Sequence, residues 1–571
     1  MTRQCLNLQE ERLDVKYKEL AEKYQELEST RKTLEKTDII AELFTDSGED
    51  LERLVLLING RIYPEWKETE IGMSSRMMKE TISEATGHDE EKVEELWRDK
   101  GDLGLAAEEL VDKKKQQRLF SKELTVSKVL EKLRKVAEME KEGISQSVSQ
   151  DKKRGEIADL ISSAKPLEAR YLVRTVLGHL RIGVAEGIIR DALAEAFFDG
   201  KNTEEIQKAY NFTNDFTEVA RACRKGLEEV KSLELELFRP VNSMLAKKVD
   251  TIEEGFETVG KPALIDKKYD GMRAQIHVRE GEVKVFTRRL EDVTEQFPDV
   301  VNAVEEHIDA ENCILDTEVV GYDPEDGSMI EFQKLSKRIK RKYDIQKLKN
   351  EIPVEVRPFD IIYLNEPILE KPYQERLEKL DSITRREEKK LRTVDRKITS
   401  EVEEVQEMQQ RSLSEGHEGI MMKNLEAEYK PGSRVGYMVK LKPVMETLDL
   451  AIIAAKWSEG ERAGWLGRLF LGCYNKETGE YEEVGKMATG LTEEQFEEVT
   501  ERLKPLIEKE EGRKVWVKPE IIVEVEYEEI QESPTYSSGY ALRFPRLKTF
   551  RDDKDSADSL EKVESIYRSQ K

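Results

Sequence analysis

Lys268 begins the hexapeptide Lys-Tyr-Asp-Gly-Met-Arg, the segment of the chain best suited to chemistry. The Asp-Gly pair predicts a sharp turn, and the alternating residues 274–279 predict a strand directly behind it. A lysine amine, with an ordinary pKa of about 10.4, becomes nucleophilic at neutral pH only when burial or a nearby cation lowers that pKa. Lys267 and Arg273 are close enough in sequence to help. This layout predicts a lysine that carries a nucleotide covalently; the alternative is a surface lysine beside a hairpin.

Such a lysine also needs groups that bind a triphosphate, a ribose, a base and a divalent metal. The chain carries basic, acidic and aromatic candidates in order after the hexapeptide. They are Arg273, Arg288, Glu318, Phe359, Glu418, Arg434, Lys440, Lys442, Arg551 and Lys554. Singly, each has an ordinary explanation, such as a core aromatic for Phe359 or a salt-bridge partner for Glu318. Their number and order favour one shared site.

The length of 571 residues, with 38% hydrophobic content, predicts a multidomain protein, because a single core does not grow to this size. No apolar stretch reaches the roughly 20 residues needed to span a bilayer, and no signal-peptide core follows Met1. We therefore expect an intracellular protein without a membrane segment. The four widely spaced cysteines contain no CxxC pair, so neither a zinc ribbon nor a disulfide framework is indicated.

The net charge of −25 argues at first against a polyanionic partner. Local clusters decide such contacts, however, and residues 334–342 form a dense basic run within the acidic chain. This run is also explained by a solvated helix face.

Three kinds of sequence pattern follow one another along the chain. Residues 1–238 show helical spacing of apolar residues, including an apolar stripe over residues 169–194 that is interrupted near Gly178 and Gly183. Residues 239–443 alternate short strands with helices and predict an α/β or α+β domain. Residues 444–571 predict several strands around one helix, which fits a small Greek-key barrel such as an OB-fold, with a final helix over 556–571.

These motifs resemble those of the ATP-dependent DNA ligases, within the superfamily of covalent nucleotidyltransferases that also includes RNA ligases and mRNA capping enzymes. The resemblance covers nearly the whole chain and is strongest to the archaeal and eukaryotic replicative type. It implies an all-α N-terminal DNA-binding domain, an α+β nucleotidyltransferase (adenylation) domain and a C-terminal OB-fold β-barrel. It also implies ATP as the AMP donor and Mg²⁺ as the metal.

The resemblance implies a role for each candidate residue. Lys268 is the adenylated lysine, and Asp266, where the family usually has Glu, contacts the adenine amino group. The remaining assignments are Arg273 and Arg288 to ribose and phosphate, Glu318 to ribose or metal, Phe359 to stacking on adenine, Glu418 to metal, Arg434, Lys440 and Lys442 to the α-phosphate, and Arg551 and Lys554 to the pyrophosphate. Met438 replaces the Trp that usually stands two residues before Lys440.

The helical N-terminal half of the chain indicates which nucleic acid accepts the AMP group. Residues 100–104 (Lys-Gly-Asp-Leu-Gly) and 168–183 resemble the DNA-binding domain of replicative ligases, although helix termination also explains their glycines. Capping enzymes and RNA ligases of this kind lack such a domain, and NAD-dependent ligases carry a four-cysteine zinc site. We therefore expect a monomeric ligase that seals nicked double-stranded DNA. The alternatives are a capping or RNA-joining transferase and a catalytically silent scaffold bound to a clamp.

A further segment, Lys-Gln-Gln-Arg-Leu-Phe over residues 115–120, resembles the shortened sliding-clamp-binding box of archaeal ligases. In that box a Gln and two large apolar residues, here Gln116, Leu119 and Phe120, fill a pocket of the clamp. Ordinary helix packing is the alternative explanation for this apolar pair. The resemblance as a whole implies work in DNA replication, repair and recombination, in the cytoplasm and in association with the nucleoid.

Overall fold

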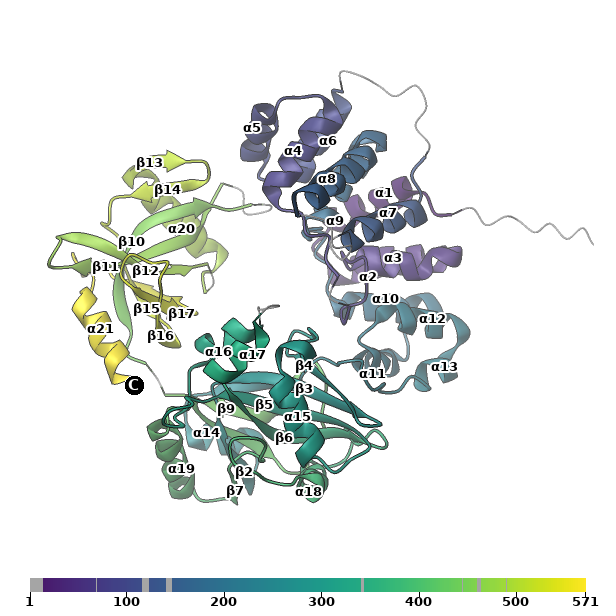
Figure 1. Cartoon of the computed structure of the whole chain (residues 1–571). Helices are drawn as coiled ribbons and strands as arrows, with labels where there is room; N and C mark the ends of the chain where they lie inside the picture. The colour runs from purple at the N-terminus through teal and green to yellow at the C-terminus, as the bar shows by residue number, and fades with distance from the viewer. Residues whose placement is uncertain are drawn as a thin grey trace, which may run out of the picture. The chain divides into compact units, whose positions relative to one another are not determined.

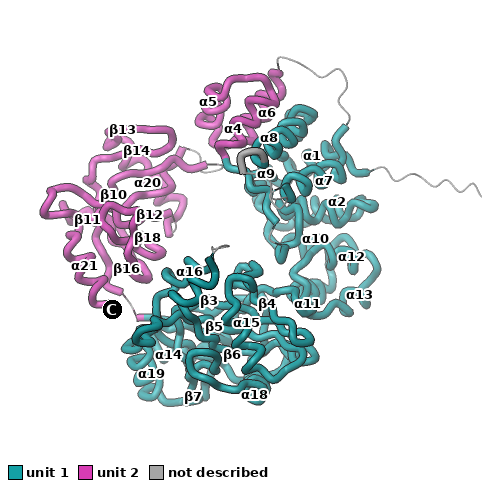
Figure 2. The backbone as a smooth tube through the Cα atoms, in the orientation of Figure 1, with its two compact units in different colours: residues 1–74, 118–442 teal, residues 75–117, 443–571 magenta. Residues whose placement is uncertain are grey.

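The computed structural model describes residues 14–67, 69–114, 123–139, 146–339, 344–443, 445–459, 464–488 and 490–570. The chain divides into two compact units, one of residues 1–74 and 118–442 and the other of residues 75–117 and 443–571 (Figure 2). None of the helices in these ranges is long and apolar enough to cross a membrane.

The N-terminal part is helical, which confirms the reading of its apolar spacing (Figure 1). The first unit contains α1 (Tyr17–Ser29), α2 (Thr33–Thr45), α3 (Leu51–Ile58), α7 (Val126–Glu138), α8 (Gln146–Ser163), α9 (Pro166–Val176), α10 (Glu186–Phe198), α11 (Thr203–Thr213), α12 (Phe216–Lys225) and α13 (Leu227–Lys231). The second unit contributes α4 (Ser75–Thr86), α5 (Glu90–Lys100) and α6 (Leu103–Asp112).

Left-handed glycines separate several of these helices. The stripe predicted over residues 169–194 belongs to α9 and α10, and Gly178 and Gly183 lie between them with φ of 70° and 61°. Gly101 ends α5 with φ of 65°, and Asp102 then caps α6 by accepting a hydrogen bond of 3.0 Å from the Leu105 amide. Helix termination therefore accounts for the glycine at position 101.

The central part of the first unit is an α+β domain, as expected. Its elements are β1 (Leu245–Val249), α14 (Ile252–Val259), β2 (Ala263–Lys268), β3 (Met272–Arg279), β4 (Glu282–Thr287), α15 (Pro298–His307), β5 (Asn312–Gly321), α16 (Phe332–Ile339), α17 (Ile345–Glu351), β6 (Val354–Leu364), α18 (Tyr373–Ile383), β7 (Arg396–Thr399), α19 (Val402–Ser414), β8 (Gly419–Asn424) and β9 (Arg434–Leu441).

The strands form two sheets. One has the order β1-β9-β8-β2-β7 and packs against α14 and α19, and the other has the order β4-β3-β5-β6 and packs against α15, α16 and α18. Each sheet has its own apolar core. The hairpin predicted behind the lysine motif is confirmed, because β3 pairs with β4 from Ala274 opposite Thr287 to Arg279 opposite Glu282.

The basic run over residues 334–342 begins on α16, while residues 340–342 lie outside the described residues. Its Arg338 is only 1% exposed. The guanidinium forms hydrogen bonds of 2.6 and 2.9 Å with Asp299 and lies 4.4 Å from the centre of the Phe297 ring. One member of the run therefore belongs to the core and not to a solvated helix face.

The C-terminal part of the second unit is rich in strands, as predicted. It contains β10 (Leu448–Trp457), β11 (Leu466–Asn475), β12 (Glu480–Met487), α20 (Glu493–Leu503), β13 (Ile507–Glu511), β14 (Lys514–Val517), β15 (Ile522–Glu526), β16 (Glu529–Glu532), β17 (Tyr540–Arg543), β18 (Arg546–Phe550) and α21 (Leu560–Ser569). Thr492 and Gln495 form a capping box at the start of α20. Among the described strands, no pairing closes the ladder β12-β11-β10-β14-β13 into a complete barrel, so the domain is an open, OB-like arrangement.

The turn between Lys268 and Met272 carries the chain from the first sheet to the second. It passes so close to β5 that a Cβ atom on Gly271 would lie 2.6 Å from the Val319 carbonyl oxygen and 2.9 Å from Cγ of Glu318. The backbone oxygen cannot move without disturbing the sheet. Only glycine fits at this position.

We expect Gly271→Ala to lower the free energy of unfolding by about 1–3 kcal/mol, because the added methyl group overpacks the turn against β5. Chemical denaturation of the full chain measures this change. Gly155, inside α8, is the matched control, since nothing lies within 4 Å of a Cβ added there. Gly155→Ala should stabilise the protein by about 0.5–1 kcal/mol. Equal effects of the two substitutions would contradict the argument that a side chain at position 271 collides with β5.

Candidate active site

Lys268 ends β2 opposite Gly419 of β8, and its carbonyl oxygen accepts a hydrogen bond of 2.9 Å from the Glu418 amide. The Lys268 ammonium forms an ion pair with the Glu418 carboxylate. The Lys442 ammonium lies 3.1 Å from the same carboxylate oxygen. Two lysines that are far apart in sequence thus converge on one carboxylate, whose side chain is 9% exposed.

The cations next to Lys268 in sequence are directed at other carboxylates. Because successive strand residues face opposite sides, Lys267 points away from Lys268 and pairs with Asp395 at 2.8 Å and with Glu415. Arg273 binds both oxygens of Asp316 at 3.0 and 2.6 Å. The structure therefore pairs the Lys268 amine with a carboxylate and not with a neighbouring cation.

Arg273 is held rigidly between the sheets. Besides Asp316 it donates a hydrogen bond of 2.7 Å to the Met244 carbonyl oxygen. The Tyr429 hydroxyl donates to Asp316 at 2.7 Å. Burial alone would lower the pKa of Arg273, but the Asp316 carboxylate outweighs that effect and raises it. The guanidinium stays charged and fixed in one geometry.

Glu318 on β5 lies near Lys268, Arg273 and Glu418. Burial raises its pKa to about 8; the two cations oppose this shift, and the Glu418 carboxylate adds to it. Two carboxylates at one place suit a hard divalent cation, which would relieve their repulsion. Within the described ranges no group of three or more His, Cys, Asp or Glu side chains could hold a metal. Mg²⁺ is commonly bound by one or two carboxylates together with substrate phosphates, so Glu318 and Glu418 suit that metal.

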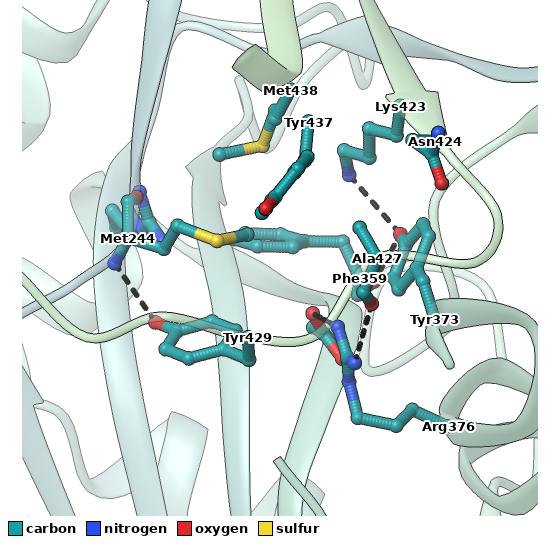
Figure 3. Close-up of a pocket in the computed structure, with 12 residues that line it drawn as sticks. Met244, Phe359, Tyr373, Arg376, Lys423, Asn424, Ala427, Tyr429, Tyr437 and Met438 are labelled. Atoms are coloured by element: carbon teal, nitrogen blue, oxygen red, sulfur yellow. Dashed lines mark hydrogen bonds and ion pairs between the residues drawn. The ribbon is translucent and has the colours of Figure 1, made fainter. Parts of the chain in front are cut away.

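A pocket lies beside Phe359 on β6 (Figure 3). The Lys423 ammonium lies 4.7 Å from the centre of the Phe359 ring, and the Arg273 guanidinium lies 5.3 Å from it. Tyr373 and Tyr429 line the same pocket. A flat aromatic ring flanked by cations is suited to hold a planar, electron-rich base.

The two departures from the family pattern have different surroundings. Met438 is 4% exposed and packs in an apolar cluster with Met244 and Ile314, so it fills core space. Asp266 is 2% exposed and pairs with Lys423 at 2.6 Å. One departure therefore changes packing, and the other is tied to a charge at the pocket.

Further basic residues surround the site. Arg288, just after β4, has its pKa lowered by partial desolvation and by the nearby guanidinium groups of Arg273 and Arg434. Arg434 begins β9, and Lys440 lies on the same strand opposite Met421 of β8. Three arginines this close repel one another, and a bound anion would relieve that repulsion.

Arg551 and Lys554 belong to the second unit. There Arg551 donates hydrogen bonds of 3.0 and 3.2 Å to the two oxygens of Asp449, and Lys554 pairs with the same carboxylate. Asp553 binds the other edge of the Arg551 guanidinium at 2.8 Å. Gln116, Leu119 and Phe120 lie outside the described residues.

Reasoning from sequence did not assign Lys423, Tyr429 or Tyr373 to the site. Lys423 lies on β8, which begins directly after Glu418. A lysine within an otherwise apolar strand must have an anionic partner, which was a usable signal. Tyr429 and Tyr373 gave no such signal, because a tyrosine near a loop has many explanations.

Three family models match the chain. The model described as "DNA ligase N terminus" matches residues 16–194, "ATP dependent DNA ligase domain" matches residues 243–442, and "ATP dependent DNA ligase C terminal region" matches residues 462–554. The chain belongs to the ATP-dependent DNA ligases.

Curated relatives agree with this placement. The DNA ligase of Nanoarchaeum equitans is 45% identical over 547 residues, covering 94% of this chain and 95% of the relative. The DNA ligase of Methanopyrus kandleri is 41% identical over 538 residues, covering 93% and 95%. The DNA ligase of Thermococcus onnurineus is 39% identical and covers 97% and 98%. The resemblance to ATP-dependent DNA ligases is therefore confirmed over nearly the full chain.

Two solved structures share the fold of this ligase at low sequence identity. "Pmar-Lig_Pre." has a TM-score of 0.60 at 17% identity, and "Pmar-Lig_PreS3" has a TM-score of 0.58 at 18% identity. Each alignment covers 93% of this chain and 99% of the other.

Glu318 should make the stability of the ligase depend on pH. Its pKa is about 8 in the folded state, above the ordinary value of 4.5. Between these values the folded protein binds a proton that the unfolded chain does not, so the free energy of unfolding falls as pH rises. We expect Glu318→Gln to remove the part of this decrease in the free energy of unfolding that comes from Glu318. Denaturant unfolding at several pH values, without divalent metal, measures the change.

Glu305→Gln, at an exposed position of α15, is the control and should keep the wild-type pH dependence. A slope in Glu318→Gln equal to that of the wild type would show that Glu318 does not titrate in this range.

Proposed function

We propose that this chain seals nicks in duplex DNA, using ATP and a covalent lysyl-AMP intermediate. The observation that carries the proposal is the convergence of Lys268, Glu418, Lys442 and Glu318 at the junction of two sheets, beside the pocket at Phe359. A nucleophile, cations for phosphate and carboxylates for a metal are the parts that nucleotidyl transfer needs.

In the first step the neutral Lys268 amine attacks the α-phosphorus of ATP. A nitrogen–phosphorus bond forms, the bond between that phosphorus and the bridging oxygen breaks, pyrophosphate leaves, and the nitrogen loses one proton to solvent. In the second step the oxygen of a DNA 5′-phosphate attacks the adenylate phosphorus, the nitrogen–phosphorus bond breaks, and the freed lysine nitrogen takes a proton from solvent. In the third, the adjacent 3′-hydroxyl attacks the 5′-phosphorus, forms the phosphodiester and expels AMP. The proton of the hydroxyl passes to solvent.

The residue roles are part of the proposal. Phe359 stacks on adenine and Asp266 contacts its amino group, while Arg273, Arg288 and Glu318 contact the ribose and phosphates. Arg434, Lys440 and Lys442 bind the α-phosphate, and Arg551 and Lys554 bind the pyrophosphate. The fixed geometry of Arg273 and the pairing of Lys442 with Glu418 support these roles, because donors held in place do not reorganise during reaction.

Glu318 and Glu418 would hold Mg²⁺, which offsets negative charge on the phosphates when bound. Glu418 also pairs with the Lys268 ammonium. Lys268 must lose a proton before it attacks, because an ammonium has no free electron pair.

We further propose the division into a DNA-binding domain over 1–238, an adenylation domain over 239–443 and an OB domain over 444–571. The ligase works as a monomer inside the cell, associated with the nucleoid, in replication, repair and recombination. Its binding to DNA should be nearly independent of sequence and should weaken steeply with salt, because phosphates supply most of the contacts. The segment 115–120 binds a sliding clamp.

Lys268→Ala should abolish the acid-labile adduct formed with labelled ATP, since no other residue supplies the amine. The measurement is adduct formation by the full chain with ATP, ADP, NAD and GTP side by side, followed by sealing of nicked DNA and nicked RNA. An adduct of normal yield in Lys268→Ala would remove the proposal. Covalent GMP or preferred sealing of RNA would favour a capping or RNA-joining enzyme, and wild-type binding without an adduct would favour a silent scaffold.

Leu119→Ala combined with Phe120→Ala should weaken binding to an archaeal sliding clamp by at least about tenfold, because two apolar anchors are removed from one pocket. Surface plasmon resonance with immobilised clamp measures this effect. Nick sealing without the clamp should stay at the wild-type rate. Unchanged clamp affinity would remove the clamp from the list of partners.

A further inference from the structure

Lys423, which lines the pocket beside Phe359, forms a buried ion pair with Asp266. The two side chains are 7% and 2% exposed, and the ammonium lies 2.6 Å from Asp266 Oδ2. The same ammonium donates a hydrogen bond of 3.2 Å to the Tyr373 hydroxyl, which in turn donates to the Phe359 carbonyl oxygen at 2.7 Å (Figure 3). The pair is therefore connected directly to the residue proposed to stack on the base.

The second oxygen of this carboxylate has no protein partner. Asp266 Oδ1 is buried and forms no hydrogen bond with any described residue. A buried acceptor without a donor is costly, so this atom is suited to accept a hydrogen bond from a ligand. The Lys423 pair leaves it no other function, because Oδ2 already takes the charge-assisted bond.

We propose that Lys423 determines which base the ligase accepts, because its ion pair keeps Asp266 a carboxylate that can only accept hydrogen bonds. The inference rests on the proposed function, in which the pocket binds the base of ATP. Adenine presents an amino group, a donor, at position 6. Guanine and hypoxanthine present a carbonyl oxygen there, which a carboxylate repels.

The neighbours of Asp266 give Lys423 this role. Burial raises the pKa of Asp266, and Lys423 on β8 is the first cation that opposes this shift. Arg396, opposite Asp266 on β7, also opposes it, but its guanidinium forms an ion pair with Asp381. Tyr373 on α18 and Tyr269 after β2 also face Asp266, and burial raises the pKa of both phenols, so they stay neutral. Without Lys423 the pKa of the buried Asp266 carboxyl would rise further, because its first opposing cation is gone.

A protonated Asp266 could donate a hydrogen bond to a 6-oxo group. Lys423→Met removes the charge and keeps most of the side-chain volume. Inosine triphosphate is the suitable probe, because hypoxanthine differs from adenine at positions 6 and 1 and lacks the 2-amino group that guanine adds. The measured quantity is the ratio of the rates of Lys268 adduct formation with labelled ATP and with labelled inosine triphosphate.

At about pH 6 we expect Lys423→Met to lower the preference for ATP by at least about tenfold, and at about pH 8 we expect part of that preference to return. Asp266→Asn should lower the preference equally at both pH values, because an amide donates without titrating. Lys423→Arg should keep the preference of the wild type, since it restores the charge.

Arg338→Met is the matched control. It breaks a different buried ion pair of the same domain, between Arg338 and Asp299. It should lower stability without changing the preference for ATP, which separates loss of a buried charge from loss of base selection.

Three results would overturn the inference. They are a wild-type preference in Lys423→Met at about pH 6, an equal loss at both pH values in that variant, and a wild-type preference in Asp266→Asn. The last of these tests the idea even if Lys423→Met does not fold. Failure of the wild type to form any adduct with ATP would instead overturn the proposed function.

Discussion

The close passage of one turn past one strand governs the geometry of the catalytic domain. The chain leaves the first sheet after Lys268 and enters the second at Met272, and Gly271 between them touches β5 at Val319 and Glu318. Because no side chain fits there, the end of β2, the start of β3 and the middle of β5 are held together by backbone. The Lys268 amine and the Glu318 carboxylate are therefore positioned by main-chain contacts, which flex less than loops.

The second constraint is the pairing of buried charges on neighbouring elements of the catalytic domain. Arg273 is held by Asp316, Lys423 by Asp266, and Arg376 by Asp360 at 2.8 and 2.9 Å. A buried ion pair contributes little net stability. Removing one partner and leaving the other buried, however, costs about 3–5 kcal/mol. Such pairs therefore specify geometry more than they stabilise the fold. In this domain the cations of the three pairs line the pocket beside Phe359.

The sequence predicts the elements well and the contacts poorly, for physical reasons. Helical spacing, the hairpin behind Lys268 and the capping box at Thr492 are local signals, and each appears in the structure. The partner of Lys268 is not local, because Glu418 comes 150 residues later, directly before the strand β8 that pairs with β2 in the fold. The adjacent cations were the obvious partners in the sequence, but strand alternation turns Lys267 to the opposite face. Tertiary pairing, which local patterns do not encode, decides which charges meet.

The acidic balance of the chain is compatible with binding anions. A net charge of −25 is unexpected for an enzyme that handles polyphosphates and DNA, if charge is counted over the whole molecule. In the site, however, the carboxylates of Asp316, Glu418 and Asp266 hold cations in fixed positions. Without these counter-ions, neighbouring cations would repel one another and lose their common orientation. Acidic residues thus help to build a site for anions, and local placement of charge outweighs the total.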